Sequence, residues 1–575
     1  MLVLKLFNRF QELFSREDST ATQLRGTPSL TGTWDTILLS TVLVWTFLGL
    51  CFPLYDTDFW WHLKTGQSII SGNGIPGLDL YTFTDADKPW IDLHWGFQIL
   101  VAVLYAIGGV PLVSLVKAGV VTSAVAVGWM AGGTGLPPWK KSILWLFPII
   151  CIAGRGNERP EMLSQLFLAL WLWIAWRSEK QPDWIWWLPL LQVVWVNCHA
   201  LFVLGLVVGF CYGVDAVIRA QFGGRFGLAP RIEGPPLESI LVVALLVALA
   251  CLINPYFEEG ALFPLTLYRK FSVEKEFYRQ NIGEFRPPIE YVMKFGLGNI
   301  YVIAELVVWL VTAASFIWLL IRKHRWSPCR LLLFAGYSHL AWQASRNTNI
   351  FALVSGVIAC QNFGDWGTIT TEVGTRGSNV PSPVGIPSRR APTQWMTGLF
   401  TVLTGLVVSG WWNEIGEKNK PFGLGEAPNW FIHDAAKFAG QDGFPLRAFV
   451  AHIGQAEVYV YHNGPFRKVF MDARLEVCTQ QTFERYNYIL DAMAAGNPIW
   501  QNVFRDGELP VVILDSRSSR AAINGMFQSP AWRLVFADKT AAVFVTREVA
   551  ARLSLPTVDP SPLMYPDGPP EGVKP

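Results

Sequence analysis

The chain has 575 residues, of which 51% are hydrophobic and only 16% are charged, and it includes 27 tryptophans and 37 phenylalanines. This composition excludes an ordinary soluble domain and indicates a polytopic membrane protein. The formal net charge of +2 gives no indication of nucleic acid as a partner. The eight cysteines are scattered along the chain, most of them in or beside apolar runs, so they predict neither a disulfide framework nor a metal knot.

Residues 1–35 precede the first apolar run. Within them, five apolar side chains fall on one helical face, which predicts an amphipathic helix lying in the membrane surface: Leu2, Leu6, Phe10, Leu13 and Phe14. Four basic residues come before the apolar run 36–54, and the positive-inside rule then places the N-terminus in the cytoplasm. The segment after this run is therefore expected on the external side of the membrane.

That segment reads Asp56-Thr57-Asp58-Phe59-Trp60-Trp61-His62 and combines two carboxylates with an imidazole at a helix exit. Charged groups are costly at this boundary, and two aspartates separated by one residue repel each other unless a cation or a proton lies between them. The segment is thus a candidate site. The alternative is an ordinary polar helix exit with interfacial tryptophans.

The loop that begins here, residues 55–92, contains six aspartates and only two lysines. This balance suits an external loop that could bind a cation. Residues 59–70 can form a short interfacial helix. Glycines and a proline at 72–77 then turn the chain back toward a second polar and aromatic segment at 90–95, which includes His94.

Twelve apolar runs predict a transmembrane region at 36–363 and a last membrane helix at 395–413. They cover residues 36–54, 95–108, 110–131, 142–154, 161–176, 184–198, 200–218, 239–253, 300–321, 329–344, 349–363 and 395–412. Clusters of basic residues between the later runs mark the cytoplasmic side, where the Gly/Ser/Thr/Pro-rich linker 364–394 is also expected. Between Asp92 and Arg155, both expected outside, lie three runs, so one of these is expected to be a re-entrant or partial crossing.

The opposite, external side collects further polar residues between the runs: Arg155, Arg159, Asn197, His199 and Arg346. Taken singly, they can be interfacial arginines, a satisfied histidine of the helix bundle or a charge at a helix end. Together with the aspartates they offer carboxylates for a cation or for general-base catalysis. They also offer arginines whose planar fork pairs with phosphate.

Several of these stretches, taken as a set, resemble a bacterial branch of the GT-C integral-membrane glycosyltransferases. They are residues 56–66, 75–76, 81–84, 90–95, 159–161, 195–199 and 254–255. The resemblance implies a multi-spanning helical fold of about 11–13 transmembrane helices in a bacterial cytoplasmic membrane. It also implies transfer of a sugar from a polyprenyl-phosphate carrier to an external glycan, lipid or protein.

The resemblance also implies roles for individual residues. Asp56 would orient or deprotonate the acceptor, and Asp58 would assist it; both are candidate ligands of a divalent cation such as Mg²⁺ or Mn²⁺. The substrate-binding candidates are His62, His94, Arg155, Arg159, Asn197, His199 and Arg346. No second acidic pair matches the metal site of the oligosaccharyltransferases, so metal dependence stays open. A non-catalytic scaffold remains the main alternative, and a transporter is less favoured because no internal repeat is found.

Residues 414–555 differ in kind from the rest of the chain. Short strand patterns alternate with helical ones, which predicts a small α/β domain, and the number of crossings places it outside. In the stretch 469–474, Asp472 and Arg474 are expected to form a structural salt bridge rather than a site. Residues 556–575 form a Pro-rich tail.

Overall fold

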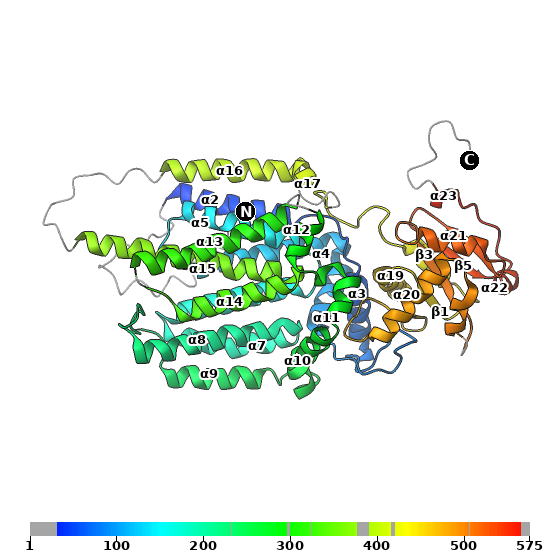
Figure 1. The fold of residues 1–575 in the computed structure, drawn as a ribbon, viewed down its shortest axis with the longest axis horizontal. Helices are drawn as coiled ribbons and strands as arrows, with labels where there is room; N and C mark the ends of the chain where they lie inside the picture. Colours follow the sequence, from blue (N-terminus) through cyan, green and yellow to red (C-terminus); the bar gives the residue numbers. More distant parts are fainter. Residues whose placement is uncertain are drawn as a thin grey trace.

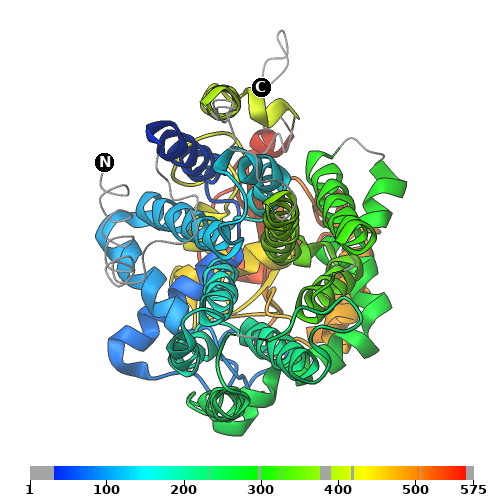
Figure 2. The ribbon, with the colours of Figure 1, turned by 90° about the vertical axis from the view of Figure 1, so that its left-hand side faces the viewer.

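The computed structural model describes residues 32–231, 233–295, 299–323, 325–375, 390–415, 420–504 and 507–564. The amphipathic helix predicted for residues 1–16 and most of the Pro-rich tail lie outside this part of the chain. Figure 1 shows long helices running side by side, with an α/β domain at one end of them. Figure 2 looks along the helices and shows them gathered into one bundle.

The bundle is built from eleven long helices of the described residues. They are α2 (Thr33–Gly49), α4 (Trp95–Ala131), α5 (Pro138–Gly154), α6 (Glu161–Ser178), α7 (Leu188–Val196), α8 (Val203–Phe222), α9 (Leu237–Ala250), α13 (Ile300–Lys323), α14 (Pro328–Gln343), α15 (Thr348–Thr375) and α16 (Arg390–Val408). By length and composition, three segments of the described chain can cross a membrane: Trp95–Ala131, Ala200–Phe222 and Ile300–Ile321. Two shorter helices, α2 and α9, are also apolar. The chain is therefore mostly helical and membrane-capable, whereas the count of crossings remains a prediction.

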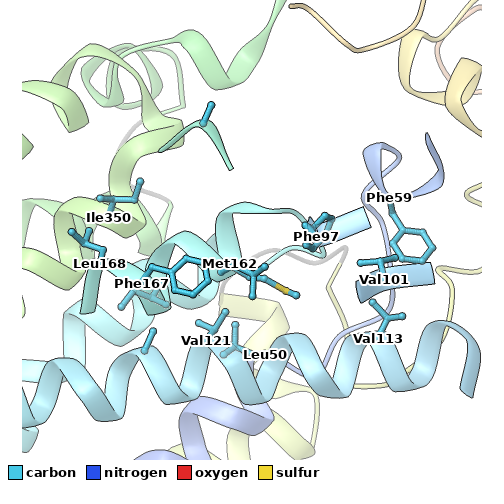
Figure 3. Packing of buried hydrophobic residues seen from close by; sticks show 14 of the residues in the cluster. Leu50, Phe59, Phe97, Val101, Val113, Val121, Met162, Phe167, Leu168 and Ile350 are labelled. Atoms are coloured by element: carbon cyan, nitrogen blue, oxygen red, sulfur yellow. The ribbon is translucent and has the colours of Figure 1, made fainter. Parts of the chain in front are cut away.

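The core of the bundle lies where α4 and α6 pack against each other. Val121 on α4 faces Met162, Phe167 and Leu168 on α6, and all four are buried (Figure 3). Burying each of these side chains stabilises the contact by roughly 1.5–3 kcal/mol within protein, less where lipid is the alternative.

A glycine pair divides α4 into two helices. Gly108 and Gly109 leave the helical conformation, and Gly109 has φ 61° and ψ −161°, a region that is open mainly to glycine. Figure 3 accordingly shows Phe97 and Val101 on a segment separate from the long helix that carries Val113 and Val121. Residues 95–107 pack against α3 (Asp58–Ser68) at the end of the bundle. The first of the three apolar runs between Asp92 and Arg155 is thus a separate helical segment at the end of the bundle. This gives a physical basis for the odd number of runs.

Further helical elements fill the junction between the bundle and the domain. They are α3, η2 (Ile69–Asn73), α10 (Phe257–Val273), α11 (Lys275–Asn281), η5 (Gly283–Phe285), α12 (Pro288–Phe295) and α17 (Trp411–Ile415). The helix α3 lies where a short interfacial helix was expected at 59–70. At the far end of the bundle, α15 continues to Thr375, into the segment 364–394 expected to be a linker. Residues 376–389 of that segment lie outside the described chain.

The C-terminal domain is an α/β domain around a five-stranded sheet with strand order β2-β1-β3-β5-β4. Its strands are β1 (Arg447–Val450), β2 (Lys468–Val469), β3 (Val511–Asp515), β4 (Trp532–Ala537) and β5 (Ala541–Thr546). The β1 strand is parallel to β2 and β3, whereas β5 is antiparallel to β3 and β4. The helices are α18 (His433–Ala439), α19 (Ile453–Asn463), α20 (Gln480–Ala494), α21 (Arg520–Gln528), α22 (Arg547–Arg552) and α23 (Ser561–Met564).

A buried ion pair ties this domain to the loop 55–92. The Nη2 atom of Arg474 lies 2.6 Å from Asp79 Oδ1 and 2.7 Å from Asp472 Oδ2, and all three side chains are at most 2% exposed. The guanidinium also lies over the rings of Tyr81 and Trp90, at 4.9 and 4.5 Å from their centroids. The expected salt bridge is therefore present, and it anchors the domain against the end of the bundle.

Candidate active site

The candidate site is built at the start of α3. Asp56 precedes the helix, and its Oδ1 accepts a hydrogen bond from the backbone N–H of Asp58 at 3.1 Å, which fixes the turn that leads into the helix. The neighbouring Leu54 exchanges backbone hydrogen bonds with Gly425 and Ala427, at 2.7 and 3.0 Å. The segment leading into the C-terminal domain thus fixes the backbone from which Asp56 projects, and the Asp56 side chain is buried.

Arg159 joins the two aspartates. Its Nε bonds to Asp56 Oδ2, and its Nη2 lies 3.0 Å from Asp58 Oδ2. Its Nη1 lies 3.4 Å from both carboxylate oxygens of Glu284. One planar guanidinium therefore links the two aspartates at the start of α3 to Glu284, which lies more than 200 residues further along the chain.

Glu284 lies near the two remaining arginines, Arg155 and Arg346. Its Oε1 lies 3.3 Å from Arg155 Nη2, and Arg346 lies over the ring of the adjacent Phe285 at 5.1 Å. Burial opposes ionisation of Glu284, but Arg155, Arg159 and Arg346 outweigh it and lower the pKa of this carboxyl. The structure thus brings the three predicted arginines together. The sequence did not single out Glu284, because the loop 255–298 holds six glutamates and six basic residues.

A fourth carboxyl, Glu457, comes from the C-terminal domain. It lies on α19, which packs against α3, and it is fully buried. Gly454 permits this approach, because a Cβ at that position would clash with Thr57 Oγ1. Sequence patterns do not single out Glu457, because the Val- and Tyr-rich stretch around it resembles a strand and predicts no helix.

Burial and the nearby charges of Asp58, Asp472 and Asp56 raise the pKa of Glu457 well above its usual range. Its oxygens have no hydrogen-bond donor among the described residues, and as a protonated acid it can itself donate to Asp58. Burial likewise raises the pKa of Asp58 to about 7, although Arg159 opposes the shift. The cluster therefore holds a carboxyl that exchanges its proton near neutral pH.

The arrangement does not fit a divalent cation held between Asp56 and Asp58. The guanidinium of Arg159 stands between the two carboxylates and takes one oxygen from each. Within the described ranges, no three His, Cys, Asp or Glu side chains are grouped to hold a metal ion. Arg159 supplies the positive charge that keeps the two aspartates together.

The predicted histidines form a second group, in which His62 of α3 meets His94 and His199. The rings of His62 and His94, and those of His94 and His199, have centroids 5.4 Å apart. Burial opposes protonation of His94, but the hydrogen bond to Asp92 at 3.2 Å outweighs it and raises the pKa of His94. Burial lowers the pKa of His62 and of His199. Of the three rings, His94 is therefore the one on which the surroundings favour a proton.

Asn197 is placed differently from the other candidates. Its Nδ2 donates to the carbonyls of Val193 and Ile253 at 2.8 and 2.7 Å, and its Oδ1 accepts from Trp95 Nε1 at 3.0 Å. These bonds connect the ends of α7, α9 and α4. The side chain serves as a cross-link between helices in this structure, not as a group directed into the arginine cluster.

No family model and no curated protein sequence matches the chain. Its structure is similar to archaeal oligosaccharyltransferase AglB from Archaeoglobus fulgidus in complex with an inhibitory peptide and a dolichol-phosphate. That similarity has a TM-score of 0.50 at 11% identity and covers 85% of this chain and 70% of AglB. ArnT from Cupriavidus metallidurans bound to undecaprenyl phosphate has a TM-score of 0.48 at 13% identity, covering 89% of this chain and 97% of ArnT. The fold resembles that of the GT-C membrane glycosyltransferases, as the sequence motifs predicted.

Proposed function

We propose that this chain is a membrane glycosyltransferase that moves a sugar from a polyprenyl-phosphate carrier to an acceptor on the external side of the membrane. The observation that carries the proposal is the position of Arg159, whose guanidinium is shared by Asp56 and Asp58 beside two further arginines. The GT-C fold supports it.

The arginines are the proposed binding site for the donor phosphate. Arg155, Arg159 and Arg346 surround Glu284, so the group on that side has more positive than negative charge. Guanidinium groups bind phosphate through paired hydrogen bonds, and such pairs are stronger at a partly buried site than in water. The similar AglB structure holds a dolichol-phosphate, which agrees with a lipid phosphate as the donor group.

In the proposed reaction, the oxygen of an acceptor hydroxyl forms a bond to the anomeric carbon of the donor sugar. The bond from that carbon to the phosphate oxygen breaks, and the polyprenyl phosphate leaves with the electron pair. Asp58 accepts the hydroxyl proton, since a carboxyl with a pKa of about 7 suits general-base catalysis at neutral pH. Asp56 holds the backbone of Asp58 and the guanidinium of Arg159 in place.

Arg159 and its neighbours stabilise the charge that develops on the leaving phosphate. Removing one such preorganised donor costs about 10²–10³ in rate in other enzymes. A divalent cation between Asp56 and Asp58 does not fit beside Arg159. In the proposed reaction the positive charge therefore comes from the arginines of the chain. The proposed orientation of the chain in the membrane follows the basic residues between the later apolar runs, which mark the cytoplasmic side. The N-terminus is then inside and residues 414–575 are outside.

A comparison of two asparagine substitutions tests the proposal against a scaffold. Asp56→Asn keeps the shape of the side chain but removes the charge that Arg159 binds, so product should fall at least 100-fold at matched expression. Asp87→Asn is the matched control: Asp87 is an exposed residue of the same loop with φ 62°, a conformation that asparagine tolerates well. Wild-type product levels in cells with Asp56→Asn, when a deletion strain makes none, would leave the scaffold as the better account.

A further inference from the structure

A cavity separate from the carboxylate and arginine cluster lies at the junction of the bundle and the C-terminal domain. Its volume is about 810 Å³, within the roughly 300–1,000 Å³ typical of small-molecule sites. Its walls come from α3, α4, the segment 426–434, α18, α19 and the turn between β4 and β5. Figure 1 shows α3 and α19 next to each other at this junction.

We infer that this cavity binds a neutral saccharide chain. That the bound saccharide is the acceptor glycan rests on the proposed glycosyltransferase function. That the cavity binds a saccharide does not depend on that function. Asp56, Asp58, Glu457 and the arginines do not line the cavity. The site would hold sugar units next to the unit that reacts.

Aromatic rings form one wall of the cavity. The ring of Trp60 lies 4.9 Å from that of Tyr461 and 4.5 Å from that of His433, and Tyr105 and Trp430 also line the wall. Such rings offer an apolar face next to a polar group. The C–H faces of a pyranose are apolar while its hydroxyls need hydrogen bonds, so a sugar matches this combination.

The lining carries charged groups of both signs. It holds three carboxylates (Glu426, Asp434 and Asp538), two ammonium groups (Lys437 and Lys539) and the imidazoles of His433 and His462. The arginines that would recognise a phosphate lie in the other cluster. Alternating donors and acceptors of both signs suit the hydroxyls of a neutral saccharide better than a polyanion.

One polar group of the lining is positioned before a ligand arrives. His433 is held between His462 Nε2 and Glu426 Oε2, at 2.9 and 3.1 Å, so its ring has a fixed orientation. Trp60 is only 1% exposed and packs behind His433 and Tyr461, which fixes the aromatic wall.

The cavity is also coupled to the start of α3. Trp430 donates from Nε1 to the carbonyl of Tyr55 at 2.8 Å, one residue before Asp56. Trp60 follows Asp58 by two positions, and such residues project in nearly opposite directions from a helix. The saccharide site and the carboxylates therefore flank the same helix end.

The test uses the full-length protein in lipid nanodiscs, because alkyl-glycoside detergents would compete for the site. The probes are maltohexaose, cellohexaose and chitohexaose, measured by isothermal titration and saturation-transfer NMR without any donor lipid. At least one hexasaccharide should bind. The double change Asp434→Ala with Lys437→Ala, at two exposed positions, should weaken its binding about tenfold, as expected for the loss of one or two hydrogen bonds.

Arg485→Ala, at an exposed position of α20 outside the cavity, is the control and should leave binding unchanged. The inference is overturned if none of the three hexasaccharides binds, if the double variant binds like the wild type, or if only an unstructured peptide binds at the site. Hexasaccharide binding without any transfer activity would contradict the proposed function alone. Asp56-dependent transfer without hexasaccharide binding would contradict the saccharide site alone.

Discussion

The Nη2 atom of Arg159 lies 3.0 Å from the Oδ2 atom of Asp58, while the Nε atom of the same guanidinium bonds to Asp56. One planar fork thus fixes the distance between two carboxylates that would otherwise repel each other. A lysine carries the same charge but offers a point contact without the fork. A lysine at position 159 therefore separates the effect of the planar, paired hydrogen bonds from the effect of the positive charge.

Arg159→Lys should lower transfer about 10²–10³-fold while the protein still inserts and folds, because charge is kept and paired geometry is lost. The measurement is product formed per unit of purified protein. Arg279→Lys is a matched control, since Arg279 also contacts two carboxylates, Glu276 and Glu290, but lies outside the cluster. Equal activity of Arg159→Lys and wild type would show that only the charge matters.

Arg346 allows a test of donor binding. Its guanidinium lies 5.1 Å from the ring of Phe285, and its charge helps to lower the pKa of Glu284. Arg346→Gln should raise the KM for the lipid-linked donor about tenfold, as expected for the loss of one phosphate contact. Arg447→Gln removes a similar contact, in which the guanidinium of the C-terminal domain lies 5.0 Å from the ring of Phe83 in the loop 55–92, and should leave the KM unchanged. A raised KM in both variants would point to a general effect on the fold.

Removal of metal ions gives an independent check. Because Arg159 stands between Asp56 and Asp58, we expect transfer by the purified protein to persist in excess EDTA. The rate should change by less than about twofold. A rate that collapses with EDTA and returns with Mg²⁺ or Mn²⁺ would mean that Arg159 leaves the two carboxylates when the enzyme works.

Local patterns were sufficient to predict several features of the structure. The apolar runs, the short helix after Asp58 and the strands of the C-terminal domain follow from periodicity and composition, and the structure contains them. Asp56 and Arg159 were both candidates from the sequence because each lies at a helix end where a charge is costly. Their direct contact spans 103 positions along the chain, so the sequence could not give it.

Other features depend on tertiary contacts. Glu284 and Glu457 have no distinctive local sequence. They become part of the site only because η5 brings Glu284 to Arg159 and α19 brings Glu457 against α3. The helix α19 itself was missed because Val458, Tyr459 and Val460 favour a strand, and packing against α3 overrides that preference. Asn197 is a candidate from the sequence because it is a polar residue at a helix end. In the structure its side chain bonds to the carbonyl of Val193 in its own helix, to Trp95 at the start of α4 and to the carbonyl of Ile253 after α9.

The sharpest prediction concerns the proton of Asp58 and its neighbour Glu457. Burial raises the pKa of Asp58 to about 7, and a general base acts only when it is deprotonated. Transfer should therefore be low below neutral pH, rise through about pH 7 and level off above it. A hydrogen bond from Glu457 stabilises the ionised form of Asp58 and so holds this pKa down.

Glu457→Leu removes that hydrogen bond and should move the midpoint of the pH profile upward by about one unit, since one unit corresponds to about 1.4 kcal/mol, close to the value of one hydrogen bond. Glu457→Gln keeps an N–H donor and should leave the midpoint near that of the wild type, because the raised pKa of Glu457 means that it is already uncharged at neutral pH. Equal shifts in both variants would indicate a packing effect, and no shift in either would exclude Asp58 as the group that titrates.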